Sequence, residues 1–314
     1  MIRLALIGFG TVNGAVYDLL QARKSIIERA LGQPYEIVKI LVRSLDRPGR
    51  DRPLFTDQVE EWLAARPDVV LEATGQGDGM AALLSRLLAS GCHVISANKA
   101  LLACHLPTLL ASAKRGGSKL RYEAAVGGAL PVMEDVDRFR LINDHIHVRG
   151  ILNGTCNFIL SQMQAGDPFL KALKAAQEQG FAEADPSDDI EGWDSRRKLC
   201  LLASRLFSVK LSEADIACEG ICQVTPDQLA ELAMRGKTLK LLAEAYQDES
   251  GQIHAWVRPQ EVDAASFFGQ VQGAENIIEL RGETTGPLRY FGLGAGGGPT
   301  ASAMVSDFLA VYGD

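Results

Sequence analysis

The 314-residue chain is long for one domain and suits two domains that share an interface. It is 47% hydrophobic and 23% charged, the balance of an ordinary globular protein. Its net charge of −7 and its lack of long Lys and Arg runs argue against nucleic acid as a partner. No run is long enough to span a membrane, and the six cysteines form no C-x-x-C pairs. We therefore expect a soluble, cytoplasmic protein with reduced thiols.

Strand-like and helix-like patterns alternate over residues 1–127. The predicted strands are short runs, mostly apolar on both faces: Ile2–Ile7, Glu36–Val42, Asp68–Ala73, His93–Ser96 and Lys119–Glu123. Helical patterns lie between them, for example Gly14–Leu31 and Met80–Ser90. Strands that are apolar on both faces are typical of a covered parallel sheet. The alternation predicts an α/β fold, with a doubly wound, Rossmann-type first domain over residues 1–127.

The pattern changes at residue 128. Predicted helices follow one another at Asn157–Ala165, Pro168–Gln179, Asp188–Phe207 and Pro226–Met234. Predicted strands come next, at Thr238–Tyr246, Ile253–Val257, Ile277–Arg281 and Leu288–Phe291. Segregated elements of this kind predict an α+β second domain with an antiparallel sheet over residues 128–293. A glycine-rich turn and a final helix, residues 294–314, are expected to return to the first domain.

The segment Gly8-Phe-Gly-Thr-Val-Asn-Gly14 follows the first strand and leads into a helix, which is the setting of a dinucleotide fingerprint. Gly8 permits the tight turn, and Gly10 lets the backbone approach a pyrophosphate at the helix N-terminus. Asn13 stands where the third glycine is usual. The alternative is an ordinary turn whose glycines serve its geometry alone. The N-terminal position before a βαβ pattern favours an oxidoreductase that binds a nicotinamide dinucleotide.

The end of the second predicted strand bears on the choice of cofactor. An NAD enzyme commonly has an acidic residue there, for the ribose 2′-hydroxyl. This strand runs instead into Arg43 and Ser44, and Arg47 and Arg50 follow. A guanidinium and a hydroxyl suit a 2′-phosphate, although a solvated basic loop is the alternative. NADP(H) is favoured, and NAD(H) stays open.

Charged residues at two further places are candidates for chemistry. Lys99 follows the fourth predicted strand, at the sheet edge where ligands bind in such folds, although a surface lysine is the alternative. Asp194 and Lys198 lie four apart in a predicted helix and share a face. An exposed ion pair is the ordinary interpretation of this spacing. The helix continues through the apolar run Leu199–Ala203, however, and charges on a buried helix are costly unless they are paired or functional.

The chain resembles homoserine dehydrogenase over nearly its whole length. The matching stretches are Gly8–Gly14, Ser96–Lys99, Tyr122–Gly128, Gly150–Asn157, Gly180–Asp189, Gly192–Lys198 and Gly294–Ser302. The dinucleotide turn alone is unspecific, whereas Glu183–Pro186 followed by Asp194 and Lys198 is highly specific. Departures from the usual family pattern are Asn13, Ser96 and Cys156.

The resemblance implies reversible NAD(P)H-dependent reduction of L-aspartate 4-semialdehyde to L-homoserine, a step of threonine and methionine biosynthesis. It implies a catalytic centre of Lys198, Asp194 and Lys99, and substrate contacts from Glu183, Asp188 and Asp189. The implied cofactor-binding residues are Gly8, Gly10, Thr11, Val12, Arg43, Lys99 and Gly296. A monovalent cation, sodium or potassium, would be bound largely through backbone at Glu123, Val126, Gly128 and Leu130.

The resemblance also implies a homodimer and a short form without a regulatory domain. Negative charge develops on the aldehyde oxygen during hydride transfer, so an ammonium within reach acts as acid and electrostatic stabiliser. Lys198 held by Asp194 suits this role, Lys99 competes for it, and the sequence leaves the choice open. Two alternatives remain: another amino-acid semialdehyde reductase on the same scaffold, and a catalytically silent dinucleotide-binding protein.

Overall fold

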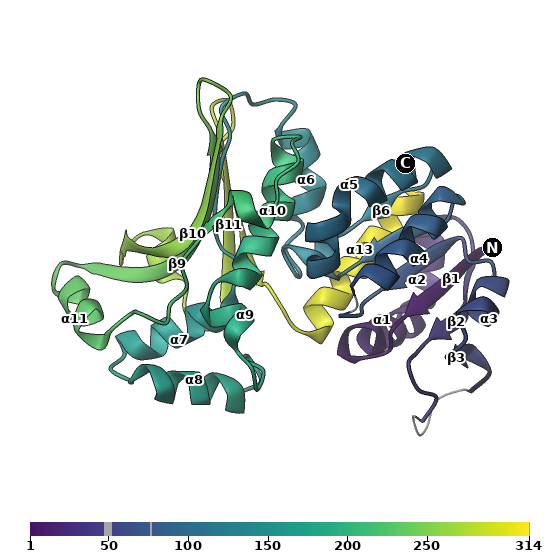
Figure 1. Cartoon of the computed structure of the whole chain (residues 1–314), viewed down its shortest axis with the longest axis horizontal. Coiled ribbons are helices and arrows are strands. Elements are labelled where there is room, and N and C mark those ends of the chain that lie inside the picture. Colours follow the sequence, from purple (N-terminus) through teal and green to yellow (C-terminus); the bar gives the residue numbers. More distant parts are fainter. Residues whose placement is uncertain (47–51, 76, 314) are drawn as a thin grey trace. The chain divides into compact units, whose positions relative to one another are not determined.

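The computed structural model describes residues 1–46, 52–75 and 77–313 (Figure 1). The chain forms two compact units, which we call unit 1 (Met1–Ala129 and Gly296–Asp314) and unit 2 (Leu130–Ala295). Unit 1 is therefore built from both ends of the chain. Among the described residues, no helix has the length and apolarity needed to cross a membrane.

Unit 1 contains a parallel six-stranded sheet in the order β3-β2-β1-β4-β5-β6. Its strands are β1 Ile2–Ile7, β2 Tyr35–Leu41, β3 Phe55–Thr56, β4 Val69–Glu72, β5 His93–Ser96 and β6 Leu120–Arg121. Its helices are α1 Thr11–Ala22, α2 Lys24–Leu31, α3 Val59–Ala64, α4 Asp78–Ala89, α5 Lys99–Gly116 and α13 Gly297–Tyr312, with short 3₁₀ turns η1 Arg52–Leu54 and η2 Glu123–Ala125. The strand order reverses between β1 and β4, which is the point where Rossmann-type sheets bind ligands. The predicted doubly wound fold is confirmed.

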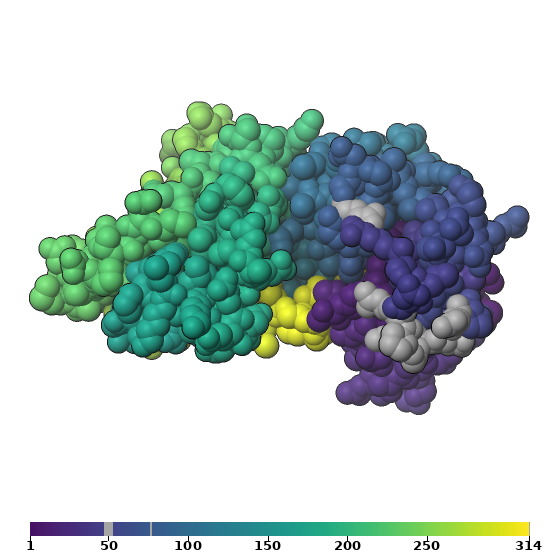
Figure 2. All heavy atoms as spheres, turned by 60° about the horizontal axis from the view of Figure 1, so that its bottom comes forward, coloured from purple at the N-terminus to yellow at the C-terminus, as the bar shows by residue number. Residues whose placement is uncertain are grey.

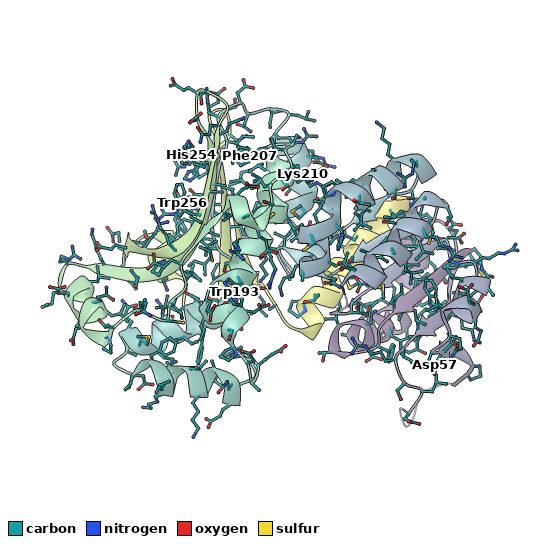
Figure 3. All side chains as sticks on the ribbon, viewed as in Figure 1. Asp57, Trp193, Phe207, Lys210, His254 and Trp256 are labelled. Atoms are coloured by element: carbon teal, nitrogen blue, oxygen red, sulfur yellow. The ribbon has the colours of Figure 1, made fainter. Side chains whose placement is uncertain are left out.

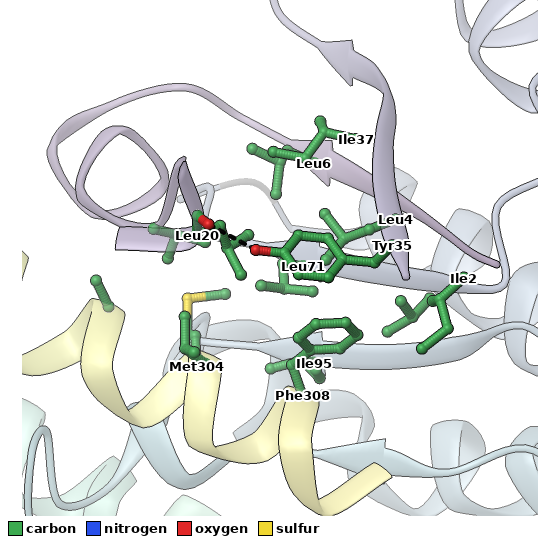
Figure 4. Packing of buried hydrophobic residues seen from close by; sticks show 14 of the residues in the cluster. Ile2, Leu4, Leu6, Leu20, Tyr35, Ile37, Leu71, Ile95, Met304 and Phe308 are labelled. Carbon is green, nitrogen blue, oxygen red and sulfur yellow. Dashed lines mark hydrogen bonds between the residues drawn. The ribbon is translucent and has the colours of Figure 1, made fainter. Parts of the chain in front are cut away.

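The core of unit 1 joins its N-terminal sheet to its C-terminal helix (Figure 4). Met304 and Phe308 of α13 are buried within the same apolar cluster as Leu4 of β1 and Leu71 of β4. The Phe308 ring also meets the Tyr35 ring edge-on, at 5.6 Å between centroids. Burying such side chains contributes about 1.5 to 3 kcal/mol each. This packing holds the final helix in unit 1.

Unit 2 contains a second six-stranded sheet in the order β12-β11-β7-β9-β10-β8. Its strands are β7 His147–Ile151, β8 Ala217–Cys218, β9 Lys237–Gln247, β10 Ile253–Asp263, β11 Glu275–Gly282 and β12 Gly286–Leu293. The prediction of an antiparallel sheet is wrong at one edge. The short strand β8 pairs parallel with β10, opposite Trp256 and Val257, whereas the other pairs are antiparallel, so the sheet is mixed.

Several helices of unit 2 pack against this sheet. They are α6 Val132–Phe139, α7 Gly154–Gln164, α8 Phe169–Glu178, α9 Ser187–Ile190, α10 Trp193–Leu206, α11 Pro226–Met234 and α12 Phe267–Gln270, with the 3₁₀ turn η3 Glu213–Asp215. Helix α8 lies at the surface, where Figure 2 shows it in teal, and it buries only Ala172 and Ala176. Helix α10 is buried along most of its length, as its apolar sequence predicts.

Two predicted helices are interrupted in the structure. The prediction of one helix over Gly14–Leu31 is wrong, because α1 ends before Arg23 and α2 begins after it. The prediction of one helix over Asp188–Phe207 is also wrong. Gly192 separates α9 from α10 with φ +84°, a left-handed conformation that side chains other than glycine rarely adopt.

Candidate active site

The glycine-rich turn after β1 has the geometry of an anion-binding site. Gly8 has φ +83°, and a Cβ there would come within 2.7 Å of the Thr74 Cγ2. A Cβ at Gly10 would meet no protein atom within 4 Å, so the backbone is open to a ligand there. Helix α1 begins at Thr11, which is exposed, while Val12 packs partly into the core. The first N–H groups of a helix favour a phosphate in this position.

Asn13 replaces the usual third glycine without opening the packing between helix and strand. Its side chain is fully buried. The Nδ2 group donates to the carbonyl oxygens of Ile7 at 2.9 Å, Gly8 at 3.0 Å and Leu71 at 3.3 Å. The amide therefore ties α1 to the ends of β1 and β4, which meet at the switch point of the sheet.

A cavity of about 780 Å³ opens beside this turn, which is within the usual range for small-molecule sites. Gly8 and Gly10 line it together with Arg43 and Ser44, both of which are exposed. Two carboxylates also line it, Asp46 and Asp57, the second of which is labelled in Figure 3. The cavity wall thus has mixed charge. Arg47 and Arg50 lie outside the described residues.

Lys99 is the first residue of α5 and is half-buried. The N-cap of this helix, Asn98, is held by two residues at the ends of strands. Its backbone N–H donates to the Ser96 hydroxyl at 3.1 Å, and its Nδ2 donates to the Glu72 carboxylate at 3.4 Å. The Glu72 carboxylate also accepts hydrogen bonds from the hydroxyls of Ser96 and Thr74. Burial raises the pKa of Glu72, and these hydrogen bonds oppose the rise.

Sequence reasoning missed Glu72. The available signal was a single acid at the end of the apolar strand Val69–Glu72, at the carboxyl edge of the sheet.

The C-terminal glycine-rich turn lies beside the dinucleotide turn within unit 1. Gly296 precedes α13 with φ +111°. The next residue, Gly297, would bring a Cβ within 2.8 Å of the Thr11 Cγ2. The two turns therefore approach each other closely at the N-termini of α1 and α13.

Asp194 and Lys198 form a buried ion pair near the start of α10, just after Trp193, which Figure 3 labels. The Lys198 Nζ lies 2.9 Å from the Asp194 Oδ2, and the two side chains are 9% and 5% exposed. The ammonium also donates to the Leu152 carbonyl at 2.8 Å. A lysine ammonium has three N–H groups, and these two partners account for two of them. The ordinary interpretation of the spacing was an exposed ion pair, whereas the structure has a buried one.

The predicted substrate carboxylates have different surroundings. Asp189 of α9 and Asp194 of α10 both accept from the Asn153 Nδ2, so the structure brings Asp189, Asp194 and Lys198 together. Asp188 is exposed, and Arg197 donates to it at 2.6 Å. Glu183 lies exposed in the loop before α9. Sequence reasoning missed Asn153 and Arg197 as partners of these groups.

The residues predicted to bind a cation lie in one short stretch of chain. Glu123 is buried at the start of η2, and its carbonyl accepts the N–H groups of Val126 and Gly127. Gly128 turns the chain with φ +60°, and the Leu130 carbonyl accepts from Val132. The part of the chain that the structure describes contains no group of three or more His, Cys, Asp or Glu side chains suited to a metal.

Two family models cover most of the chain. The homoserine dehydrogenase model matches residues 131–309, and the model of the homoserine dehydrogenase NAD-binding domain matches residues 8–123. The dinucleotide turn and Lys99 fall within the region matched by the NAD-binding model, and Asp194 and Lys198 within the region matched by the other model.

Individual relatives agree with the family models. Homoserine dehydrogenase from Bacillus subtilis is 36% identical over 316 residues, covering 99% of this chain and 72% of the relative. The crystal structure of a homoserine dehydrogenase from Thiobacillus denitrificans has a TM-score of 0.92 at 34% identity, covering 99% of this chain and 73% of that one. A hyperthermophilic archaeal homoserine dehydrogenase mutant in complex with NADPH shares the fold, with a TM-score of 0.84 at 21% identity and coverage of 99% and 97%. The chain therefore belongs to the homoserine dehydrogenase family, and its function is that of an NAD(P)-dependent homoserine dehydrogenase.

Proposed function

We propose that Lys198 is the proton donor when this enzyme reduces L-aspartate 4-semialdehyde to L-homoserine, and the proton acceptor in the reverse direction. The observation that carries this proposal is the buried pair of Asp194 and Lys198. Asp194 and the Leu152 carbonyl take two N–H groups of the ammonium. In this proposal, the third N–H group donates to the substrate carbonyl oxygen. A reduced nicotinamide supplies the hydride when it is bound.

The stabilising effect of Lys198 follows from its surroundings. Charge develops on the substrate oxygen as the carbonyl is reduced, and a fixed ammonium in a site that excludes water stabilises it more strongly than bulk water does. Asp194 keeps the ammonium in place before the substrate arrives, so little reorganisation is needed. Lys99, which is half-buried at the start of α5, is proposed as the second functional lysine, in contact with cofactor or substrate.

The acidic residues of unit 2 suit the α-ammonium of an amino-acid substrate. Asp189 and Asp194 both accept from one neutral Asn153 amide, and two carboxylates held this close together favour a positively charged group beside them. Glu183 is exposed in the loop before α9 and is available to a ligand. Asp188 is already paired with Arg197, so we expect it to contribute less to substrate binding than Asp189.

Unit 1 is proposed to bind the cofactor, with NADPH preferred over NADH. The glycines of the first turn leave room for a pyrophosphate, and Gly296 contributes from the C-terminal turn. Arg43 and Ser44 supply donors for a 2′-phosphate. The archaeal homoserine dehydrogenase mutant was solved with NADPH, a cofactor of the class proposed here. We further propose a sodium or potassium ion at the backbone oxygens of Glu123, Val126, Gly128 and Leu130.

Unit 2 is proposed to act in catalysis and in forming a homodimer. The sheet carries an aromatic group on β9 and β10, where the Tyr246 ring stacks on His254 at 5.0 Å and meets Trp256 edge-on at 5.9 Å between centroids. All three side chains are partly exposed, and Figure 3 labels His254 and Trp256. Partly exposed aromatic side chains of this kind are typical of protein interfaces.

The cytoplasm is the proposed location of this enzyme, because the six cysteines have free thiols and thiols stay reduced there.

The test is an assay of the purified chain with L-aspartate 4-semialdehyde and either NADPH or NADH, each with and without sodium or potassium ions. We expect turnover with both nucleotides, a lower KM for NADPH, and higher activity with the cation. Sedimentation of the same sample is expected to give the mass of a dimer. Activity with neither nucleotide would contradict the proposed reaction, and equal KM values would contradict the preference alone.

A further inference from the structure

The turn between β7 and α7 carries an asparagine whose side chain has only one orientation available. Asn153 is the N-cap of α7, and its Oδ1 accepts the Cys156 backbone N–H at 2.8 Å. The side chain is 4% exposed. Because the oxygen is committed to the helix, the amide nitrogen must point away from α7.

The Asn153 amide nitrogen reaches two carboxylates on two other helices. Its Nδ2 donates to the Asp189 Oδ1 at 2.7 Å and to the Asp194 Oδ2 at 2.8 Å. Both N–H bonds of the amide are thus used. A neutral group with two donors holds two negative groups close together without adding charge, and among good N-cap residues only asparagine has such a group.

The same turn also holds the other member of the ion pair. The carbonyl of Leu152, the residue before Asn153, accepts from the Lys198 ammonium at 2.8 Å. The Asp194 Oδ2 that accepts from Asn153 is also the oxygen 2.9 Å from Lys198. Two consecutive residues of one turn therefore hold the two members of the pair: Asn153 holds Asp194, and Leu152 holds Lys198.

We infer that Asn153 is a positioning residue for the reaction: it fixes the Asp194 carboxylate, and through it the Lys198 ammonium, in the arrangement that meets the substrate oxygen. This inference rests on the proposed role of Lys198. Without the amide, the Asp194 carboxylate loses one of the groups that hold it, and the geometry of its pair with Lys198 changes. A displacement of about 1 Å at a reacting group costs up to about a hundredfold in rate.

The test compares Asn153→Ser and Asn153→Asp with wild type in steady-state kinetics. Serine and aspartate cap a helix about as well as asparagine, so both variants keep the cap and lose the two amide donors. We expect kcat to fall about ten- to a hundredfold in Asn153→Ser and further in Asn153→Asp, with the KM for NADPH within about twofold of wild type. Melting temperatures are measured alongside.

The matched control is Asn157→Ser. Asn157 is also a buried asparagine of α7, but its Nδ2 donates to the carbonyls of Val271 and Gly273, away from the pair. We expect this variant to melt earlier than wild type but to keep kcat within about threefold.

A second readout uses pH. The titratable groups around position 153 are Cys156 of α7, Asp189 of α9, and Asp194 and Lys198 of α10. In Asn153→Asp, the introduced carboxyl regains one donor when it is protonated. Its kcat relative to wild type is therefore expected to rise as the pH falls from about 8 to about 6, which a loss of capping alone does not produce.

Three outcomes would overturn the inference. Wild-type kcat in both variants would show that the amide serves only as a cap. Loss of a cooperative melting transition in both would make Asn153 a determinant of the fold instead. A kcat loss in Asn157→Ser equal to that in Asn153→Ser would trace the effect to α7 as a whole. If wild type itself is inactive, the proposed reaction fails first, so the two failures are distinguishable.

Discussion

Arg43 is the residue on which the proposed cofactor preference mainly depends. It lies at the carboxyl end of β2 and lines the cavity with Ser44, but Asp46 and Asp57 line the same cavity. These two carboxylates repel a 2′-phosphate. NADPH is therefore preferred only if the attraction of the Arg43 guanidinium for that phosphate is stronger than this repulsion. Arg47 and Arg50, which also favoured NADP(H) in the sequence, lie outside the described residues.

Arg43→Ala is expected to raise the KM for NADPH about ten- to a hundredfold, because a hydrogen bond to a charged group contributes about 1.5 to 3 kcal/mol. The KM for NADH is expected to stay within about twofold. Steady-state kinetics with each nucleotide measure both values, and Arg29→Ala, an exposed arginine of α2, is the control. An equal rise for both nucleotides would contradict a 2′-phosphate contact.

The residues of the site differ in how far the sequence could predict them. The Asp194–Lys198 pair could be predicted, because its charges enter an otherwise apolar helix and the structure buries them together. The role of Asn153 could not, because its partners lie 36 and 41 residues away in the sequence and only the folded chain brings them together. The pairing of Asp188 with Arg197 was missed for another reason: the two residues are nine apart, and the sequence predicted one helix where the structure has α9 and α10.

Secondary-structure elements were predictable where an apolar or periodic pattern was uninterrupted and its ends were clear. Strands β1 and β5 and helix α11 have the predicted bounds. The break at Gly192 was missed because one glycine within a helical pattern is often tolerated. Strand β7 was missed because its five residues include His147, Arg149 and Gly150, which give a weak strand signal even at the centre of a sheet.

A buried lysine links three elements of unit 2. Lys240 of β9 is 1% exposed, and its ammonium donates to the Asn157 Oδ1 of α7 at 3.0 Å and to the Val271 carbonyl after α12. Burial lowers the pKa of Lys240 from 10.5 to about 8. Between these two values the unfolded chain binds a proton that the folded chain does not. The contribution of Lys240 to stability is therefore greatest above about pH 10.5, is lost as the pH falls to about 8, and is level below that.

Wild type is therefore expected to gain stability relative to Lys240→Met as the pH rises from about 8 to about 9.5. The expected gain is about 1 to 2 kcal/mol, because one unit of pKa corresponds to about 1.4 kcal/mol. Urea denaturation at both pH values measures the difference, whatever constant offset the lost hydrogen bonds add. Lys174→Met, at an exposed position of α8, should show no such change. A difference independent of pH would mean that Lys240 keeps an ordinary pKa in the folded chain.

At the scale of the whole molecule, the sequence predicted the class of fold and the family, because both depend on patterns spread along the chain. The parallel pairing of β8 could not be predicted from the sequence, because a two-residue strand leaves no periodic signal. The structure divides the chain into two units that carry different groups: the glycine turns and the cavity in unit 1, and the buried ion pair in unit 2. Our account assigns cofactor binding to the first and proton transfer to the second.

The most direct test of this account measures NADPH binding and turnover in Lys198→Ala. We predict that the Kd for NADPH stays within about twofold of wild type, while kcat for aspartate semialdehyde falls at least about a hundredfold, the usual effect of losing a positioned acid. Lys210→Ala, which changes an exposed lysine after the end of α10, serves as the control and should keep both values. Turnover at the wild-type rate in Lys198→Ala would contradict the account, because the buried pair would then have no part in the reaction.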